Sequence, residues 1–425
     1  MSKKVTSIYE IADLNSKSIT KDDTPNSIYY LDTSNITRNR IDNLKYLQLS
    51  KEEYPSRAKR KVKDKTIVYS TVRPNQEHFG ILDNPIENLI VSTGFTTIDI
   101  KDINVIDPLY LYYYITQKRI TNHLQAIAEN SVSSYPSINS SDIGELIITF
   151  PLEIKEQQKK ITLLSSIDKK IELNNRINAE LEAMAKTLYD YWFVQFDFPN
   201  EEGKPYKSSG GKMIYNSILK REIPEGWSVD RLQSYINFKR GISYKSNEIS
   251  DIQGKEFLNL NSFSLKGEFK IEGTKYFIGK YNQESLVSSG GLVVAITDVT
   301  RNADIIGKAF IIPNIFEDGA LISCDVVSVT SERLNKFYLE QLFNSTYYHS
   351  YIKYYASGTL VLHLNLNGIN WFNTILPPVG LLNRFEEFCK PILKKKAVIL
   401  KENKQLIELR DWLLPMLMNG QVTVK

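Results

Sequence analysis

The stretch LEIKEQQKKITLLSSIDKKIELNNRINAELEAMAKTLYDYWFVQFDF, residues 152–198, contains neither glycine nor proline. Its apolar residues lie three or four positions apart, or multiples of these, and so form one stripe on an α-helix. The residues that define this stripe are Ile161, Leu164, Ile167, Ile171, Ile177, Leu181, Met184, Leu188 and Tyr191. At 1.5 Å per residue, about 40 helical residues extend roughly 60 Å. Because this length exceeds an ordinary globular domain, we expect the helix to pack along a second helix.

The candidate second helix runs from about Leu381 to Met418. Its apolar stripe is less regular and comprises Phe385, Phe388, Ile392, Val398, Ile399, Leu406, Leu409, Leu413 and Leu417. Pro391 and Pro415 interrupt the stripe, and we expect Pro391 to mark a kink or a helix start. The sequence predicts an antiparallel pair that forms a coiled-coil spacer between two globular domains. The alternative is that each helix packs only on its own domain.

The chain also repeats itself with a period near 226 residues. IVYSTVRPN (67–75) and VVAITDVTRN (293–302) are both apolar, β-branched runs that lead into a polar loop, and Val68 falls opposite Val294 (294 − 68 = 226). A glycine follows each run, Gly80 in one half and Gly307 in the other. Further strand-like segments, aromatic helical segments and polar turns then follow in the same order.

This repeat predicts an α/β (α+β) protein with a pseudo-two-fold arrangement of two similar domains. We place the first domain at residues 1–151 and its helix at 152–198. Residues 199–221 include EEGKPYKSSGGK, whose Gly, Ser and Lys content is typical of a mobile linker. The second domain is expected at 222–378 and its helix at 379–425.

Composition excludes several classes of protein. The 42% hydrophobic residues are ample for packed cores, and a net charge of +4 excludes a basic coat for nucleic acid, so any such binding must come from local clusters. Two cysteines suit a reducing compartment and form no disulfide framework. The N-terminus lacks the apolar core of a signal peptide, and no run of about 18 apolar residues could span a membrane. We therefore expect a cytoplasmic, soluble protein.

Catalytic motifs are missing from the sequence. Asp107-Pro-Leu-Tyr resembles the base-flipping tetrad of adenine methyltransferases, but it lacks the second proline and instead predicts a helix start. Asp83, Asp99 and Lys101 could form a nuclease-like set, although such combinations are common in a chain with this many charges. The four histidines show no metal-ligand spacing.

Several tracts, taken in order, resemble the specificity subunits (HsdS) of type I restriction-modification systems. Residues 152–198 resemble the central conserved region of that family, and IPEGW, GISYKS, TDVTRN and ASGTLVLHLN resemble segments of its second domain. YPSRAKRKV and TVRPN resemble one class of target-recognition domain. One departure lies at VGLLNRFEEF (379–388), where the acidic-Glu-Gln run of the first copy has no counterpart. The two partner-docking surfaces need not be equivalent for that reason.

The resemblance implies that each domain reads one half of a split target in double-stranded DNA, and that the helices set the separation of the half-sites. It also implies two methyltransferase subunits and two restriction/translocase subunits as partners. S-adenosylmethionine, ATP and Mg are then expected on those partners, so that this chain would bind no cofactor and would be catalytically silent.

Candidate DNA-contacting residues are those that can neutralise phosphates or read base edges. In the first domain they are Arg57, Lys59, Arg60, Lys61, Arg73, Asn75, Gln76, Ser133, Ser134 and Tyr135. In the second domain they are Lys239, Arg240, Tyr244, Lys245, Thr297, Thr300, Arg301, Asn302, Ser357, Thr359 and His363. The alternative for the basic cluster is an edge strand guarded by lysines, and for the others ordinary loops.

Three other functions remain open from the sequence. One is the specificity subunit of another restriction class, whose partner fuses methylation and cleavage. A second is a DNA-modifying enzyme that uses Asp83, Asp99 and Lys101. The third is a coiled-coil adaptor that binds only protein.

Overall fold

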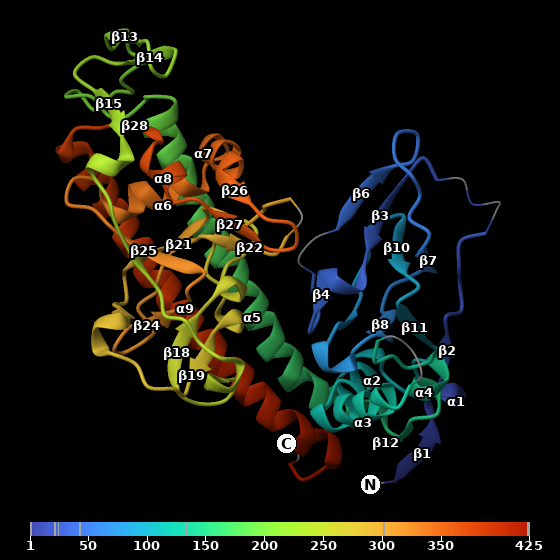
Figure 1. The fold of residues 1–425 in the computed structure, drawn as a ribbon. Coiled ribbons are helices and arrows are strands. Elements are labelled where there is room, and N and C mark those ends of the chain that lie inside the picture. Colours follow the sequence, from blue (N-terminus) through green and yellow to red (C-terminus); the bar gives the residue numbers. More distant parts are fainter. Residues whose placement is uncertain are drawn as a thin grey trace. The chain divides into compact units, whose positions relative to one another are not determined.

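The computed structural model describes residues 2–20, 23, 25–41, 44–131, 135–300 and 302–422. The chain divides into two compact units: unit 1 comprises Met1–Ile171 and Leu406–Lys425, and unit 2 comprises Glu172–Gln405. Each unit contains a domain of mixed helix and strand together with a part of each of two long helices. These helices are α5, Ile154–Tyr189, and α9, Val379–Asn419 (Figure 1). Within the described ranges no helix is long and apolar enough to cross a membrane.

The domain of unit 1 is built on two four-stranded sheets, with the orders β2-β11-β8-β9 and β6-β3-β10-β7. A two-stranded sheet pairs its first strand, β1, with its last, β12, and β4 pairs with β5 in a hairpin. The strands are β1 Lys3–Ser7, β2 Ala12–Leu14, β3 Ser27–Leu31, β4 Ile36–Thr37, β5 Arg40–Ile41, β6 Lys45–Gln48, β7 Ala58–Lys61, β8 Ile67–Ser70, β9 Phe79–Ile81, β10 Leu89–Ser92, β11 Phe95–Ile100 and β12 Ile147–Pro151. The helices are α1 Ile8–Ile11, α2 Pro108–Ile115, α3 Lys118–Glu129 and α4 Ser140–Gly144.

The domain of unit 2 has sheets in the orders β16-β25-β21-β23, β17-β19-β18-β24-β20 and β22-β27-β26, and it pairs β15 with β28 and β13 with β14. The strands are β13 Met213–Asn216, β14 Arg221–Pro224, β15 Ser228–Arg231, β16 Asn237–Arg240, β17 Ile249–Ser250, β18 Lys255–Leu258, β19 Lys275–Phe277, β20 Leu286–Val287, β21 Leu292–Ala295, β22 Thr297–Asp298, β23 Ala309–Ile311, β24 Ala320–Ile322, β25 Val326–Thr330, β26 Ala356–Ser357, β27 Leu362–Leu364 and β28 Asn373–Leu376. The helices are α6 Lys336–Asn344, α7 Thr346–Ile352 and α8 Asn367–Asn370.

The sheet orders confirm the internal repeat. β2-β11-β8-β9 and β16-β25-β21-β23 are all antiparallel and occur in the same order. In the second sheet of each domain, β3 runs parallel to β10 as β18 runs parallel to β24. Central strands such as β8 are buried along their whole length, because both of their faces are covered.

The side-chain directions correct the predicted offset of the repeat. Val68 belongs to the apolar cluster on the face of its sheet that includes Leu31 and Val91. Its counterpart in unit 2 is Val293, whereas Val294 joins the cluster on the opposite face, together with helices α6 and α7. The offset at these strands is therefore 225 (293 − 68), because a slip of one residue turns a strand's side chains to the other face.

The loops that follow β8 and β21 also correspond differently from the prediction, which paired Gly80 with Gly307. The carbonyl of His78 accepts a hydrogen bond from the nitrogen of Ser70, as the carbonyl of Lys308 does from Ala295, both at 2.9 Å. The residue before each carbonyl has a left-handed backbone, with φ of 57° at Glu77 and 72° at Gly307. Gly307 thus corresponds to Glu77 and not to Gly80.

The long helices pair antiparallel, as the sequence predicts. In unit 2 Glu182 on α5 pairs with Lys396 on α9 at 2.5 Å, and Asn174 donates a hydrogen bond to Asn403 at 2.8 Å. In unit 1 Asp168 pairs with Arg410 at 3.1 Å. As the residue number decreases along α5, the residue number of the partner on α9 increases, so the two helices run in opposite directions.

Helix α9 has the extent that the sequence predicts, and it excludes the alternative of a helix start at Pro391. It starts at Val379 and continues through both Pro391 and Pro415 to Asn419, so Pro391 marks no helix start. A proline inside a helix removes one backbone hydrogen bond, but packing of the apolar stripe outweighs this loss.

The departure from the family pattern at 379–388 changes how α9 is attached to its own domain. In unit 1, Gln157 on α5 is fully buried, donates to the carbonyl of Pro151 at 2.8 Å and accepts from the nitrogen of Asp107 at 2.9 Å. The corresponding residue of α9 is Leu382 (157 + 225), whose carbonyl accepts a hydrogen bond from Asn335 at 2.6 Å. In the first copy a side chain of the helix thus bonds to the backbone of the domain, whereas in the second copy a side chain of the domain bonds to the backbone of the helix.

Asp107 caps α2 by accepting a hydrogen bond from Leu109 at 2.9 Å, with Pro108 at the first helical position. The structure confirms that the Asp-Pro-Leu-Tyr segment is a helix start.

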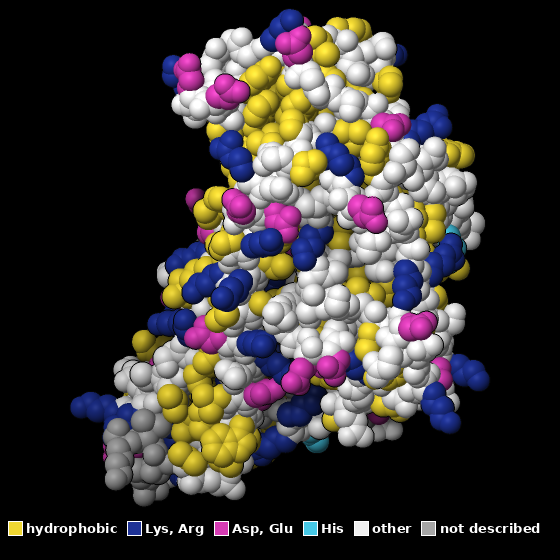
Figure 2. Space-filling model, turned by 90° about the vertical axis from the view of Figure 1, so that its left-hand side faces the viewer, with side chains coloured by type: hydrophobic (Ala, Val, Ile, Leu, Met, Phe, Trp, Pro, Cys, Tyr) yellow, Lys and Arg dark blue, Asp and Glu magenta, His cyan; other side chains and the backbone are white. Residues whose placement is uncertain are grey.

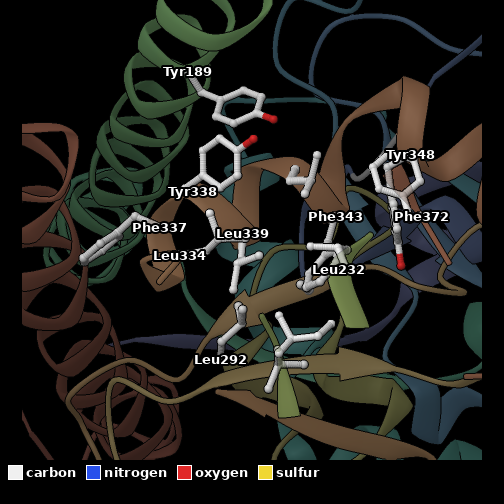
Figure 3. Close-up of a cluster of buried hydrophobic side chains, with 14 of the residues drawn as sticks. Tyr189, Leu232, Leu292, Leu334, Phe337, Tyr338, Leu339, Phe343, Tyr348 and Phe372 are labelled. Atoms are coloured by element: carbon white, nitrogen blue, oxygen red, sulfur yellow. The ribbon is translucent and has the colours of Figure 1, made fainter. Parts of the chain in front are cut away.

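The C-terminal end of α5 supplies much of the core of unit 2. The ring of Phe193 makes edge contacts with Tyr338, at 5.0 Å between centroids, and with Phe385 of α9, at 5.2 Å. Figure 3 shows Tyr189 of α5 lying against Tyr338 of α6 above the apolar residues of the sheet, and their centroids are 5.6 Å apart. The aromatic run after Tyr189 therefore joins the helix to its domain.

Residues 199–221, which the sequence predicts as a mobile linker, fold against unit 2. Phe198 stacks on Tyr206 at 4.7 Å and on Trp227 at 5.1 Å. Strand β13 then pairs with β14. Aromatic stacking thus holds a segment whose Gly and Ser content alone favours flexibility.

Replacement of Phe385 by alanine tests this core, because Phe385 is 0% exposed. We expect Phe385→Ala to lower the free energy of unfolding by about 3–5 kcal/mol, since it removes buried surface and leaves a cavity. Phe388→Ala on the same helix is the control, because Phe388 is 40% exposed and should cost within about 0.5 kcal/mol. Chemical denaturation measures both, and equal losses would contradict this view of the core.

A half-buried histidine in unit 2 predicts a pH dependence. Burial and the charges of Lys308 and Lys353 lower the pKa of His349 to about 4. Between about 4 and the ordinary value near 6.5 the unfolded chain binds a proton that the folded chain does not, so stability falls as the pH drops through this window. We expect His349→Gln to flatten the fall in melting temperature between pH 6.5 and 4. Parallel curves for the two proteins would contradict the assignment.

Candidate nucleic-acid interface

Two loops predicted to contact DNA meet in unit 1. Val72, after β8, forms a bridge with Ser137, and the nitrogen of Arg73 donates to the carbonyl of Pro136 at 2.9 Å. The turn at 72–77 and the segment that leads into α4 therefore lie side by side. Ser133 and Ser134 lie outside the described residues.

Arg73, Asn75 and Gln76 are exposed on a backbone that is held at several points. Residues Pro74–Gln76 form a 3-10 turn, and the nitrogen of Asn75 donates to the side chain of Gln125 on α3 at 3.1 Å. The guanidinium of Arg73 lies over the ring of Tyr135 at 5.6 Å, a cation–π contact. These side chains therefore project from a rigid turn, as base readout requires.

The basic cluster of unit 1 is only partly available to a phosphate. Lys61 pairs with Asp23 at 2.5 Å, and this contact helps to lower the pKa of Asp23 to about 2. Arg60 has its Nε buried without a hydrogen-bond partner among the described residues. Arg57 and Lys59 are exposed and make no ion pair within the described ranges. They are the members of the cluster best placed to meet a phosphate.

The strand that carries this cluster, β7, is the last in its sheet. Residues 17–19 cover part of its edge, since the nitrogen of Ile19 donates to the carbonyl of Lys59 and the nitrogen of Lys61 donates to that of Lys17. The cluster thus lies on an edge strand, as the alternative expected, but residues 17–19 cover part of that edge.

The corresponding loops also meet in unit 2. Thr297 on β22 and Ser357 on β26 both pair with His363 on β27. Ser357, Thr359 and His363 are exposed. Thr297 is 4% exposed, so its side chain is part of the sheet core and offers no surface to a ligand, contrary to prediction.

A buried aspartate holds the loop after β22. Asp298 is fully buried and accepts hydrogen bonds from the nitrogens of Thr300 at 2.6 Å and Ile306 at 2.9 Å. Asn302 is exposed, and Thr300 is half-buried. Arg301 lies outside the described residues.

The third predicted segment of unit 2 comprises Lys239, Arg240, Tyr244 and Lys245. It begins on β16, an edge strand, and continues into the loop that follows. Only glycine fits at position 241, because an added Cβ would lie 2.2 Å from the carbonyl oxygens of Ile322 and Ser323. Lys239 donates to the carbonyl of Glu284.

Beyond that glycine the segment divides into packed and exposed side chains. Tyr244 packs edge-on against Phe257 at 4.9 Å, and burial raises its pKa. Lys239, Arg240 and Lys245 are all exposed, and of these Lys239 is already engaged by the carbonyl of Glu284.

The residues of the alternative nuclease site each contact other residues, and Asp83 pairs with Lys65. Asp99 is buried and accepts hydrogen bonds from the hydroxyls of Ser16 and Thr66, both at 2.6 Å. Lys101 donates to the carbonyl of Tyr9 at 2.6 Å. In the part of the chain that the structure describes, no group of three or more His, Cys, Asp or Glu could hold a metal ion.

Charge is finely divided over the face of the molecule that Figure 2 shows. On the face in Figure 2, Lys and Arg side chains alternate with Asp, Glu and apolar side chains and form no continuous basic sheet. This agrees with the net charge of +4 and leaves the loops above as the local candidates.

Glu77 was missed by the analysis of the sequence. It ends the turn that carries Arg73, and its carboxylate pairs with Arg38 and, at 3.4 Å, with Lys118. No sequence signal marks it, because its partners lie 39 and 41 residues away.

Comparisons with known proteins agree with this arrangement. The family model for the type I restriction modification DNA specificity domain matches residues 2–183. The type I restriction enzyme HindI specificity subunit of Haemophilus influenzae is 24% identical, over 93% of this chain and 94% of that protein. The MjaIX specificity subunit of Methanocaldococcus jannaschii is 27% identical, over 92% of this chain and 87% of that protein.

A solved structure shares the fold along the whole chain. The type I restriction-modification S subunit from M. genitalium matches with a TM-score of 0.51 and 16% identity, over 98% of this chain and 96% of that one. The ordered motifs, the repeated sheets and these matches agree with one another, and the family-model match over residues 2–183 together with the two relatives supports an assignment of the chain as a type I restriction-modification specificity subunit.

Proposed function

We propose that this chain is the DNA-recognition subunit of a type I restriction-modification complex and that each of its two domains reads one half of a split target. The observation that carries the proposal is the equivalence of the loops in the two units. Val72 meets Ser137 in unit 1 as Thr297 meets His363 in unit 2. Two copies of one fold thus present two different sets of polar side chains from the same place.

The exposed residues divide by the chemistry they offer. Arg73, Asn75 and Gln76 in unit 1, and Asn302 in unit 2, have the side chains that read purine edges. Exposed cations suit phosphates, which orient a protein on the duplex without reading its sequence. They are Arg57, Lys59, Arg240 and Lys245.

The remaining parts of the proposal concern the assembly. The domains are those expected at 1–151 and 222–378, and α5 with α9 acts as the spacer between them. Two methyltransferase and two restriction/translocase subunits bind this chain. S-adenosylmethionine, ATP and Mg are held by those partners, and this chain is the non-catalytic subunit of the complex.

Methylation mapping tests the function directly. DNA is taken from cells that express this chain with its methyltransferase partner, and modified positions are located. We expect a motif of two short specific sequences separated by a gap of fixed length. A continuous motif, or modification that does not change when this chain is replaced by a relative, would overturn the proposal.

Replacement of Arg73 tests base readout by the first domain. We expect Arg73→Ala to weaken binding by about 1–3 kcal/mol and to relax one position of one half-site, because a bidentate contact to a guanine would be lost. Lys59→Ala is the matched control and should weaken binding equally on all sequences. A selection from randomised duplexes measures both, and a uniform loss for Arg73→Ala would make this residue a phosphate contact.

A further inference from the structure

Glu77 occupies a position whose backbone favours glycine. Its φ is 57°, in the left-handed region, where a side chain costs free energy. The second copy of the fold uses Gly307 at the corresponding position, with φ of 72°. A charged residue kept at this cost indicates that its side chain has a task.

The carboxylate of Glu77 is held on two sides. It pairs with the Nε of Arg38 and with the Nζ of Lys118 at 3.4 Å, and it is 14% exposed. The nitrogen of Arg38 also donates to the carbonyl of Glu77 at 3.0 Å. Arg38 and Asn39, with φ of 46° and 68°, form the turn between β4 and β5. Glu77 is thus joined to a hairpin by its backbone and by its side chain.

The same arginine extends the contact to the long helices within unit 1. The Nη1 of Arg38 lies 3.3 Å from Asp411 of α9. Arg410 pairs with Asp411 at 2.8 Å and with Asp168 of α5 at 3.1 Å. Tyr113 of α2 donates to Asp168 at 2.5 Å. Carboxylates and guanidiniums therefore alternate from the turn to both helices.

Among the residues of unit 2 that the structure describes, this series of ion pairs has no counterpart. The positions that correspond to Asp168 and Arg410 are Leu393 (168 + 225) and Ala185 (410 − 225). Gly307 has no side chain to take the place of Glu77. Among the described residues, the series of ion pairs from Glu77 to Asp168 therefore occurs in the first copy alone.

We propose that Glu77 is a positioning residue for sequence reading by the first domain. Its carboxylate, held by Arg38 and Lys118, fixes the end of the turn that presents Arg73, Asn75 and Gln76. Loss of the carboxylate removes none of those three side chains, but it leaves the end of the turn less firmly held. Base preference therefore relaxes at one half-site only. This proposal rests on the proposed function and names a residue that acts through the turn without touching DNA.

Two substitutions separate positioning from simple stabilisation. Glu77→Gln removes the charge and keeps the shape, whereas Glu77→Gly also relieves the left-handed backbone and copies the second domain. Glu87→Gln is the control, because Glu87 is an exposed acid of the same domain outside this network. The full chain, assembled with its methyltransferase partner, is assayed by selection from randomised duplexes and by thermal unfolding.

We expect both Glu77 variants to lose about tenfold in base preference at one half-site, as a displaced bidentate contact would, with the other half-site unchanged. The melting temperature of Glu77→Gly should equal or exceed that of its Glu77→Gln counterpart. The double variant Arg38→Gln/Glu77→Gln should lose no more preference than either single variant, because the two residues act together.

Other outcomes overturn the proposal. Unchanged preference at both half-sites, or an equal loss at both that follows the melting temperature, would reduce Glu77 to a structural brace. If the unaltered chain selects no split motif, the proposed function itself fails, and this result is seen before any variant is made.

Discussion

The rest of the structure depends on how two long helices cover their apolar stripes. A helix of 36 residues such as α5 cannot hide its stripe alone, and each end solves this in a different way. Near its start, Ile161 and Leu164 join the core of unit 1 together with Leu417 of α9. Near its end, Tyr189 and Phe193 enter the core of unit 2. Each domain therefore encloses a piece of both helices.

This constraint explains why the fold could be predicted from the sequence to a large extent. The absence of Gly and Pro over residues 152–198, together with the period of the stripe, is a local property, and so are the apolar runs of β8 and β21. The repeat followed from the order of such segments. Its offset was wrong by one residue at β8 and β21, because propensity does not show which face a side chain takes, and only Val68 and Val293 in their clusters decide this. The predicted match of Ile138 with Leu364 is confirmed, since their nitrogens donate to the carbonyls of Thr71 and Ile296 at 2.8 Å.

The candidate site was less predictable because it depends on contacts between distant segments. The turns at 72–77 and 297–302 were found as polar loops after buried strands, but nothing local shows that Thr297 is buried or that Lys61 meets Asp23. Glu77 gave no signal at all, since its left-handed backbone and its ion pairs exist only in the folded chain. Pro391 left open whether the second helix starts there, and only the folded chain shows that the helix already begins at Val379.

The small sheets β1-β12 and β15-β28 have a consequence for the evolution of the chain. In unit 1 the sheet joins the first strand of the domain to its last, and in unit 2 it joins β15, which follows the β13-β14 hairpin, to the last strand, β28. The two ends of each domain therefore lie side by side. A domain closed in this way can be exchanged as a cassette by recombination at its flanks, because a foreign domain with the same closure meets the helices at the same two points. New target preferences can then arise by replacement of one module at a time, without redesign of the helices that carry it.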